Sequence, residues 1–276
     1  LLLLSLLLIV ATPTFSEEEE PLIMENADIF RGFGTSGKYH LEGGIKFKRG
    51  KARFYTEKAT WDSGKDELLC TGGFKFTHPK GRLTAEQGYY KKAEDRVHAE
   101  GNIVARDSAS SLFMYADELD YFQKERLTRL KKGNPRIKRV IENEAGGADT
   151  LEIAARLFEF NDSLRIATAT TLVKVTKGTM VIRCDTSVYN MKEGILTLTG
   201  NPIAQIEGFE IHGKKMRITM SEDTIKTLEV IAEARGNKKE STGEGSTEIS
   251  ELEGDSLFVE FNGNTISNLE VVGSAQ

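Results

Sequence analysis

Residues 85–103 read AEQGYYKKAEDRVHAEGNI, and residues 56–74, which lie 29 positions earlier, read TEKATWDSGKDELLCTGGF. The two segments share little identity. In both, however, a small residue precedes an acid, an aromatic residue follows five positions after the small one, and a glycine follows eleven positions after the aromatic one. Strict spacing with loose identity is typical of stacked structural repeats, because stacking specifies geometry and polarity rather than identity. The pattern therefore predicts a repeat protein.

The same pattern extends along most of the chain. A fourth copy carries one extra residue, a fifth, around Ala155 and Phe160, lacks the glycine, and later copies are shorter. The small-acid pairs that begin the other copies are Ala27-Asp28, Thr56-Glu57, Ala85-Glu86, Ala116-Asp117 and Cys184-Asp185. We expect the glycines of these copies to mark a kink or bulge, where a β-carbon would clash or where φ is positive.

Inside each copy the apolar residues alternate with a period of two. Leu112–Ala116 reads LFMYA and Leu151–Ala155 reads LEIAA, whereas no segment shows a sustained helical period. Polar breaks such as KKAED, SGKDE and NMKEG separate these runs and have the composition of hairpin turns. The sequence predicts an all-β fold of repeated antiparallel strands, about two per copy and roughly 14–16 in total.

One apolar face per strand, stacked copy on copy, makes a long apolar stripe. The stripe can be closed core, or it can be an open apolar trough that holds lipid, and the mixture of large and small side chains is compatible with both. The residues that alternate within the strands and recur near one phase of the repeat are Phe54, Leu83, Leu112, Met114, Leu151, Ile153, Ile182, Leu196, Leu198, Met216, Ile218, Leu257 and Val259. We predict that they face the interior and bind acyl chains.

The two ends of the chain and one internal segment depart from the repeat. Residues 1–16 begin with the apolar run LLLLSLLLIVA and precede four glutamates, which favours part of a signal peptide over a buried strand. We therefore expect an exported protein whose mature chain begins near residue 17. Residues 236–254 are polar and lack an apolar period, which predicts a flexible loop. The sequence stops at Gln276 inside another copy, so we expect the repeats to continue beyond it.

Composition and motifs argue against several functions. The net charge of −5 does not favour nucleic-acid binding, which needs a basic surface. The four histidines are scattered without metal-ligand spacing, and the chain has no phosphate loop and no nucleophile elbow. A recurring acid could form a catalytic row, as in polysaccharide-cleaving enzymes, but it recurs because the turn recurs. We expect no enzyme activity, no cofactor and no metal site. Cys70 and Cys184 lie four copies apart, so we expect them not to form a disulfide.

The best-formed copies carry a resemblance to a known family. Residues 115–135 read YADELDYFQKERLTRLKKGNP and residues 183–202 read RCDTSVYNMKEGILTLTGNP. This recurrence resembles the OstA-like lipopolysaccharide-transport family, which includes the bridge protein LptA, its relative LptC and the N-terminal domain of LptD. The resemblance runs from about Leu22 to Gln276 and implies that the mature chain, residues 17–276, is a series of OstA-like repeats.

The resemblance implies a β-jellyroll whose apolar groove carries the acyl chains of lipopolysaccharide through the periplasm, bridging the inner and outer membranes. It also implies partners of like fold, which stack edge to edge, and an association with the outer membrane. The degenerate fifth copy and the polar segment 236–254 depart from the pattern. The alternative is a structural β-repeat module of the envelope that carries no lipid.

Overall fold

The computed structural model describes residues 22–32, 37–108, 111–142, 148–221, 224–242, 246–263 and 265–273. These residues divide into two compact units. The N-terminal unit comprises described residues up to 137 together with 157–164, and the C-terminal unit comprises 138–156 and the residues from 165 onward. The predicted signal peptide, residues 1–16, lies outside the described residues.

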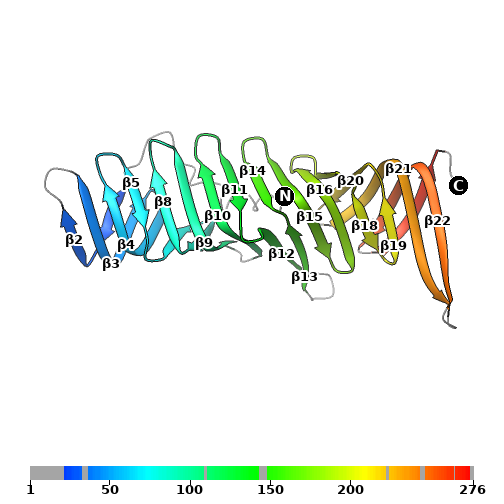
Figure 1. Cartoon of the computed structure of the whole chain (residues 1–276), viewed down its shortest axis with the longest axis horizontal. Coiled ribbons are helices and arrows are strands. Elements are labelled where there is room, and N and C mark those ends of the chain that lie inside the picture. The colour runs from blue at the N-terminus through cyan, green and yellow to red at the C-terminus, as the bar shows by residue number, and fades with distance from the viewer. Residues whose placement is uncertain are drawn as a thin grey trace. The chain divides into compact units, whose positions relative to one another are not determined.

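All secondary structure in the described residues is β-strand, and all pairings given are antiparallel, which confirms the predicted fold class (Figure 1). The strands of the N-terminal unit are β1 (Ile23–Asn26), β2 (Ile29–Gly32), β3 (Lys38–Arg49), β4 (Ala52–Asp62), β5 (Glu67–Cys70), β6 (Phe74–His78), β7 (Gly81–Ala85), β8 (Gln87–Lys91), β9 (Arg96–Asp107), β10 (Leu112–Phe122), β11 (Leu127–Lys131) and β14 (Leu157–Asn161). Strand β12 (Arg136–Glu142) has residues in both units.

The strands of the C-terminal unit follow the same pattern. They are β13 (Ala148–Ala154), β15 (Ile166–Lys177), β16 (Met180–Asn190), β17 (Ile195–Thr199), β18 (Ile203–Ile206), β19 (Phe209–His212), β20 (Lys215–Ser221), β21 (Thr224–Thr242), β22 (Ser246–Asn262) and β23 (Thr265–Val272).

Within each unit the strands pair as two ladders, which we call ladder A and ladder B. In the N-terminal unit, ladder A runs β2–β3–β4–β5–β8–β9–β10–β11–β14 and ladder B runs β1–β3–β4–β6–β7–β9–β10. In the C-terminal unit, ladder A runs β15–β16–β17–β20–β21–β22–β23 and ladder B runs β13–β15–β16–β18–β19–β21–β22. The long strands belong to both ladders and join them at a corner.

The repeated glycines lie at this corner, as the sequence predicts. The register between β3 and β4 shifts between Glu42 and Ile45, where Gly43 has φ 76° and Gly44 has φ 51°. Gly101 and Gly200 occupy the same place in later copies, with φ 81° and 78°. A bulge with positive φ turns a strand sharply, and glycine adopts that conformation without steric cost. The corner also explains the strand count. Seven predicted strands are interrupted there, and each then gives two short strands, such as β5 and β6.

Residues 236–242 and 246–254 form strands where the sequence predicts a loop. These residues belong to a hairpin of β21 and β22, whose register continues from Arg235↔Glu253 to Thr242↔Ser246. The backbone ladder pairs residues whatever their polarity, and the side chains of Arg235 and Glu253 form a cross-strand ion pair at 3.1 Å. A two-stranded ribbon therefore forms from this largely polar sequence, which lacks the apolar alternation of a half-buried strand.

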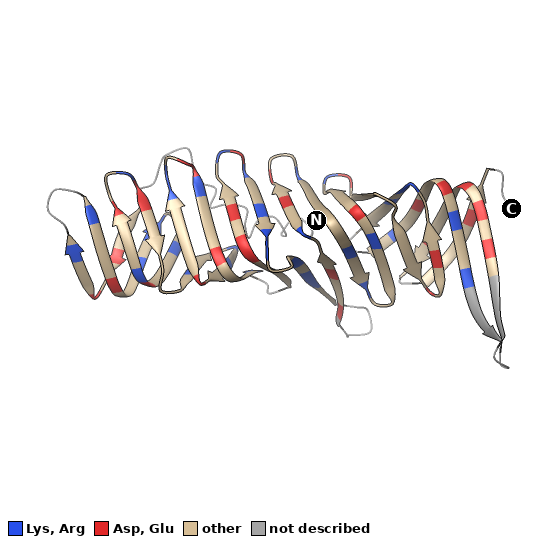
Figure 2. Ribbon diagram, viewed as in Figure 1, with Lys and Arg blue, Asp and Glu red and all other residues tan. Residues whose placement is uncertain are grey.

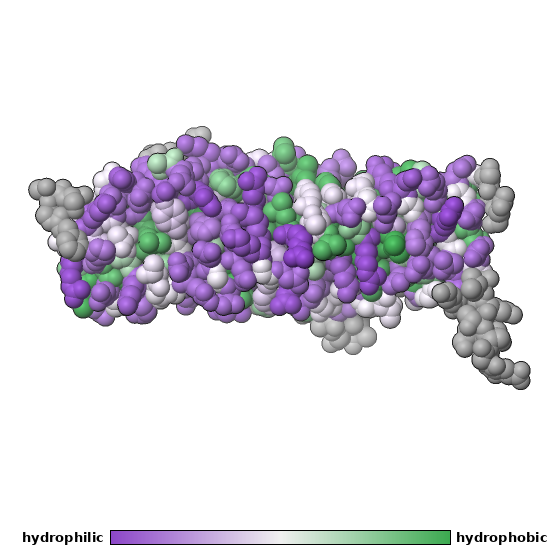
Figure 3. Space-filling model, in the orientation of Figure 1, coloured by the Kyte–Doolittle hydropathy of each residue, from purple (hydrophilic) through white to green (hydrophobic). Residues whose placement is uncertain are grey.

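The surface of each unit is polar and of mixed charge. Figure 2 shows lysine and arginine interspersed with aspartate and glutamate on the strands of both units. On the face shown in Figure 3, hydrophobic residues appear only as small separate patches. Among the described residues there is no helix long and apolar enough to cross a membrane.

Candidate functional site

Ladder A and ladder B face each other across an apolar interior in the N-terminal unit. The ring of Phe47 in ladder B meets the ring of Trp61 in ladder A edge to face, with centroids 5.7 Å apart. Gly88 of ladder A lies against the Phe74 ring of ladder B, and a β-carbon on residue 88 would come within 3.0 Å of that ring. Both contacts join residues from different ladders, so the space between the ladders is filled by side chains.

The C-terminal unit has an interior of the same kind. Gly236 of ladder B faces Leu257 of ladder A, whose Cδ1 atom would lie 3.6 Å from a β-carbon on residue 236. The largest fully buried side chains there include Ile182, Leu198 and Met216, each less than 2% exposed. Each unit thus has its own apolar interior.

The predicted lipid-facing residues lie in these two interiors. Eleven of the thirteen are buried, and the other two, Leu151 and Ile153 on β13, are partly exposed. All of them except Leu112 and Leu151 fall into four rows across the ladders. The rows that contain them are Phe54–Phe76–Leu83–Ala105–Met114, Ile153–Val175–Ile182–Ala204, Leu198–Met216–Val230–Leu257 and Leu196–Ile218–Leu228–Val259. Their binding of acyl chains stays a prediction.

The burial of these residues shows whether the interior is an open trough or a filled core. Met114, Ile182 and Leu257 are each 1% exposed, as side chains in a packed core are. In the described residues the interior is therefore filled rather than hollow. Accessible apolar space remains at the edge opposite the corner, which we call the mouth.

The mouth of the C-terminal unit contains an apolar pocket of 210 Å³. The turns of both ladders form it. Its apolar lining residues are Met180 and Ile206 from ladder B and Ile225 and Phe261 from ladder A, and Lys177 lines the same pocket. Beside it, the carboxylate of Glu207 accepts a hydrogen bond from the backbone nitrogen of Ile266 at 3.1 Å, which ties the two rims of the mouth together.

The aromatic residue of the repeat forms a row that the sequence predictions did not include among the lipid-facing residues. In the N-terminal unit the row runs Trp61–Leu68–Tyr90–Val97–Tyr121–Thr128–Phe160 across ladder A. Tyr90, Tyr121 and Phe160 are buried, and burial raises the pKa of Tyr121 above the usual range. The indole N–H of Trp61 is buried with no hydrogen-bond acceptor among the described residues. The sequence could have indicated this row, because its aromatic residues stand at the aromatic position of the repeat.

A cluster of ionisable groups lies on the outer face of ladder A in the N-terminal unit. Ligand atoms of His98, Glu118 and Asp120 lie within 4.8 Å of one another. His98 Nδ1 is 2.7 Å from an Asp120 carboxylate oxygen, and Lys131 Nζ is 2.9 Å from the other oxygen of Asp120 and 2.7 Å from Glu118. Arg96 Nε also donates to Asp120, at 2.8 Å. Histidine and acids 20 positions apart in the sequence gave no metal-ligand signal, and strand pairing alone brings them together.

The electrostatics of this cluster are those of an ion network. Burial by itself would raise the pKa of Asp120, but hydrogen bonds from His98, Lys131 and Arg96 outweigh it and hold that pKa well below its usual range. Hydrogen bonds from Lys131 and Lys132 likewise lower the pKa of Glu118. Since Arg96, Lys131 and Lys132 already bind the carboxylates of Asp120 and Glu118, we assign the cluster a structural role.

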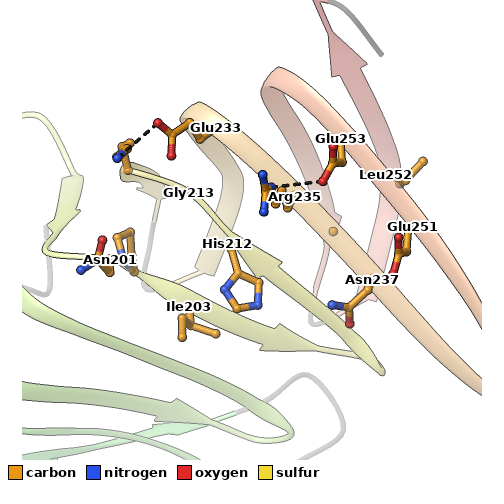
Figure 4. Close-up of a pocket in the computed structure, with 13 residues that line it drawn as sticks. Asn201, Ile203, His212, Gly213, Glu233, Arg235, Asn237, Glu251, Leu252 and Glu253 are labelled. Carbon is orange, nitrogen blue, oxygen red and sulfur yellow. Dashed lines mark ion pairs between the residues drawn. The ribbon is translucent and has the colours of Figure 1, made fainter. Parts of the chain in front are cut away.

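A second pocket, of 590 Å³, lies on the outer side of ladder B in the C-terminal unit (Figure 4). Two ion pairs line it, Lys214 with Glu233 at 3.2 Å and Arg235 with Glu253 at 3.1 Å. His212 in its wall bonds Glu210 through Nε2, at 2.8 Å. Four of the five charged side chains in the lining are paired within the pocket, so we assign it no ligand.

The two cysteines are free and buried, each in its own unit. Burial raises the pKa of each thiol to about 12, and for Cys184 the neighbouring Asp185 adds to the effect. At neutral pH both are protonated thiols, which are poor nucleophiles and poor metal ligands.

Comparisons with known proteins give structural similarities but no family or sequence match. No family model matches the chain, and no curated protein matches it in sequence. The crystal structure of LptH from Pseudomonas aeruginosa, described as the LptA-homologous periplasmic component of the lipopolysaccharide transport device, is similar at 10% sequence identity and a TM-score of 0.38. The similarity covers 44% of this chain and 82% of LptH. At this TM-score it adds nothing to the assignment of the fold, which rests on the strands themselves.

Proposed function

We propose that this chain is a lipid carrier of the cell envelope, which shelters acyl chains between ladder A and ladder B. The observation that carries the proposal is the apolar pocket at the mouth of the C-terminal unit. It opens onto an interior whose side chains are apolar from row to row. The role is binding and transport, and no step of it calls for a catalytic residue or a cofactor.

The physical need for such an interior follows from the cost of exposing hydrocarbon to water. Each exposed CH₂ group costs about 0.8 kcal/mol, so a chain of a dozen carbons costs on the order of 10 kcal/mol. A carrier must cover that chain along its whole path. Rows of apolar side chains repeated from strand to strand provide a continuous surface, whereas a single globular pocket covers only one position.

Entry of a lipid requires the two ladders to move apart at the mouth, because the interior side chains are packed. The corner joins the ladders covalently through the long strands, while at the mouth the rims of the C-terminal unit meet through Glu207 and Ile266 and through the side chains around the pocket. The mouth is therefore the side at which separation breaks the fewest backbone contacts.

The identity of the cargo and of the compartment rests on the sequence. The repeat resembles that of the OstA-like lipopolysaccharide-transport family, and the leader-like Leu1–Ala11 favours export. On this basis we propose lipopolysaccharide as the cargo, the periplasm as the compartment, and other jellyroll transport proteins as partners that pair at the sheet edges.

A photo-crosslinking residue tests the proposal directly. Met114 and Phe261 face the interior or line the pocket, whereas their neighbours Tyr115 and Glu260 face outward and serve as matched controls. We expect lipid adducts, detected by mass spectrometry after expression in a Gram-negative host, at Met114 and Phe261 and none at the controls. Equal labelling at all four positions, or no adduct at any, would contradict a carrier role.

One observation favours a second candidate, a structural β-repeat module without lipid cargo. The interior is filled by its own side chains, as in a closed core. The partly exposed Ile153 separates the two candidates, because Ile153→Asp places a charge on the lipid path without burying it fully. In a carrier this variant stays folded and loses lipid capture. In a closed module, by contrast, neither the unaltered chain nor the variant captures lipid.

A further inference from the structure

Lys177 occupies an unusual position at the mouth of the C-terminal unit. It is the last residue of β15 and follows the buried Val173 and Val175 at a period of two, so it lies on the interior side of the strand. It lines the apolar pocket together with Met180 and Phe261. Among the described residues no hydrogen bond or ion pair to Lys177 is found, although its side chain is only partly exposed.

The N-terminal unit repeats this arrangement with an arginine. Arg49 is the last residue of β3 and follows the buried Ile45 and Phe47 at the same period. A glycine of nearly the same φ follows each cation, 57° at Gly50 and 55° at Gly178, so the two turns have matching geometry. Two different copies of the repeat thus end the same strand of ladder B with an inward cation.

The contacts of Arg49 show where such a cation reaches. Its Nη1 atom donates to the hydroxyl of Tyr90 at 2.5 Å, and its guanidinium carbon lies 5.4 Å from the centre of the Tyr90 ring. Tyr90 belongs to ladder A, so the side chain spans the mouth. An inward cation on the rim of ladder B therefore sits above the entrance to the apolar interior rather than out in solvent.

We propose that Lys177 and Arg49, each at the mouth of its own unit, each bind the anionic head group, a phosphate or a carboxylate, of an amphiphile whose hydrocarbon chains occupy the interior of that unit. A cation held beside an apolar surface is partly desolvated, and it gains most from an anion that arrives joined to an apolar chain. The two cations thus select charged amphiphiles over neutral ones. This inference rests on the proposed function and adds the class of head group to it.

The test compares three probes on the full chain by titration calorimetry. Dodecyl phosphate and dodecyl maltoside, both below their micellar concentrations, carry the same hydrocarbon chain under a charged and a neutral head, and inorganic phosphate supplies the anion alone. The variants are Lys177→Gln and Arg49→Gln, with Lys177→Arg to restore the charge. Lys174→Gln and Lys46→Gln are the controls, because these exposed lysines lie on the outward side of the same two strands. Circular dichroism melting checks that every variant folds.

We expect the unaltered chain to bind dodecyl phosphate at least tenfold more tightly than dodecyl maltoside. The double variant Lys177→Gln/Arg49→Gln should lose about ten- to a hundredfold in affinity for dodecyl phosphate, the range of charge-assisted hydrogen bonds, and keep its affinity for dodecyl maltoside. Lys177→Arg and both controls should bind as the unaltered chain does.

Three outcomes overturn the inference in distinguishable ways. Equal binding of both amphiphiles by all variants removes the head-group role and leaves the proposed function intact. Inorganic phosphate that binds as tightly as dodecyl phosphate, and competes with it, identifies a site for free anions. Failure of both amphiphiles to bind removes the proposed function together with the inference.

Discussion

The carboxylate of Asp117 packs directly against the α-carbon of Gly133, so that a β-carbon on residue 133 would stand less than 3.0 Å from the Asp117 carboxyl carbon. The same relationship joins Glu86 to Gly101 and Asp185 to Gly200. In each case the acid of one strand lies over the corner glycine of its neighbour. The acid and the glycine of the repeat are therefore two halves of one packing contact.

The copies that lack the glycine also lack the acid, as this packing requires. Arg156 replaces the acid opposite Thr171, and Lys214 replaces it opposite Ala232. The backbone bond across the corner is kept in both, from Arg156 N to Thr171 O and from Lys214 N to Ala232 O, each at 3.0 Å. A longer basic side chain can turn away from the neighbouring backbone, which leaves room for a β-carbon there.

Two glycine-to-alanine substitutions separate the cost of positive φ from the cost of the contact with the acid. Gly133→Ala adds a methyl group at φ 64° and against Asp117, whereas Gly178→Ala adds one at φ 55° with no atom within 4 Å. We expect the free energy of unfolding in urea to fall by about 1 kcal/mol for Gly178→Ala, from backbone strain, and by about 3 kcal/mol for Gly133→Ala, from strain plus overpacking. Asp117→Ala in the Gly133→Ala background should recover part of the loss. Equal losses at the two glycines would show that the acid plays no part.

The fifth copy lacks the corner glycine, so there the opposite substitution, one that introduces glycine, can be tested. Thr171 and Leu172 hold φ values of 66° and 56° at the corner, where other copies have Gly-Asn, and the Leu172 side chain is 66% exposed. A β-branched residue in the left-handed region is strained. We expect Thr171→Gly/Leu172→Asn to raise the free energy of unfolding by about 1–2 kcal/mol, seen as a higher melting temperature. Thr170→Gly, one residue away in ordinary strand, should instead lower it by roughly 0.5–1 kcal/mol. If Thr170→Gly also stabilised the protein, relief of positive-φ strain at the corner would not be the cause.

The ion network around Asp120 predicts a pH dependence of stability. Asp120 and Glu118 have pKa values lowered from ordinary values of 3.8 and 4.5, so they bind fewer protons in the folded state than in the unfolded state. Their contribution is complete above the ordinary values and is lost as the pH falls through the lowered ones. We expect the urea midpoint to fall steeply below about pH 4.

Asp120→Asn isolates this contribution. At pH 7 the variant should lose about 2 kcal/mol, because Arg96 and Lys131 lose a charged partner but stay partly solvated. Below pH 3 it should match the unaltered chain more closely. A loss that is the same at both pH values would show that the carboxylate charge contributes nothing.

The last strand of the C-terminal unit predicts a surface for assembly. Among the described residues β23 pairs on one side only, with β22, and Val272 on it is 49% exposed. An unpaired strand edge pairs readily with another chain. We expect Val271→Pro to abolish concentration-dependent assembly in sedimentation velocity and to leave the monomer folded, while Val271→Ala keeps the assembly. Assembly that survives the proline would place the contact elsewhere.

Local regularities of the sequence were sufficient to predict the strands, the corners and most of the inward face. Alternation of the kind seen in Leu112–Ala116 determines which side chains point the same way, because successive residues of a strand face opposite sides. Glycine at a constant spacing predicts where φ is positive, because that preference belongs to the residue itself. For the same reason the inward aromatic row could have been predicted from the positions of Trp61, Tyr90 and Tyr121.

Only the tertiary structure decided which strands lie together and how tightly the two ladders close. The neighbours of Asp120 come from β9 and β11, and no local pattern in the sequence indicates that these two strands supply partners to one carboxylate. The pairing of β21 with β22 through residues 236–242 and 246–254 depends on a backbone ladder, which a polar sequence does not predict. The filling of the interior depends on the separation of two ladders whose side chains interdigitate, as Phe74 does with Gly88. A sequence specifies the polarity of each face, but the distance between two faces is set by the shapes that meet there.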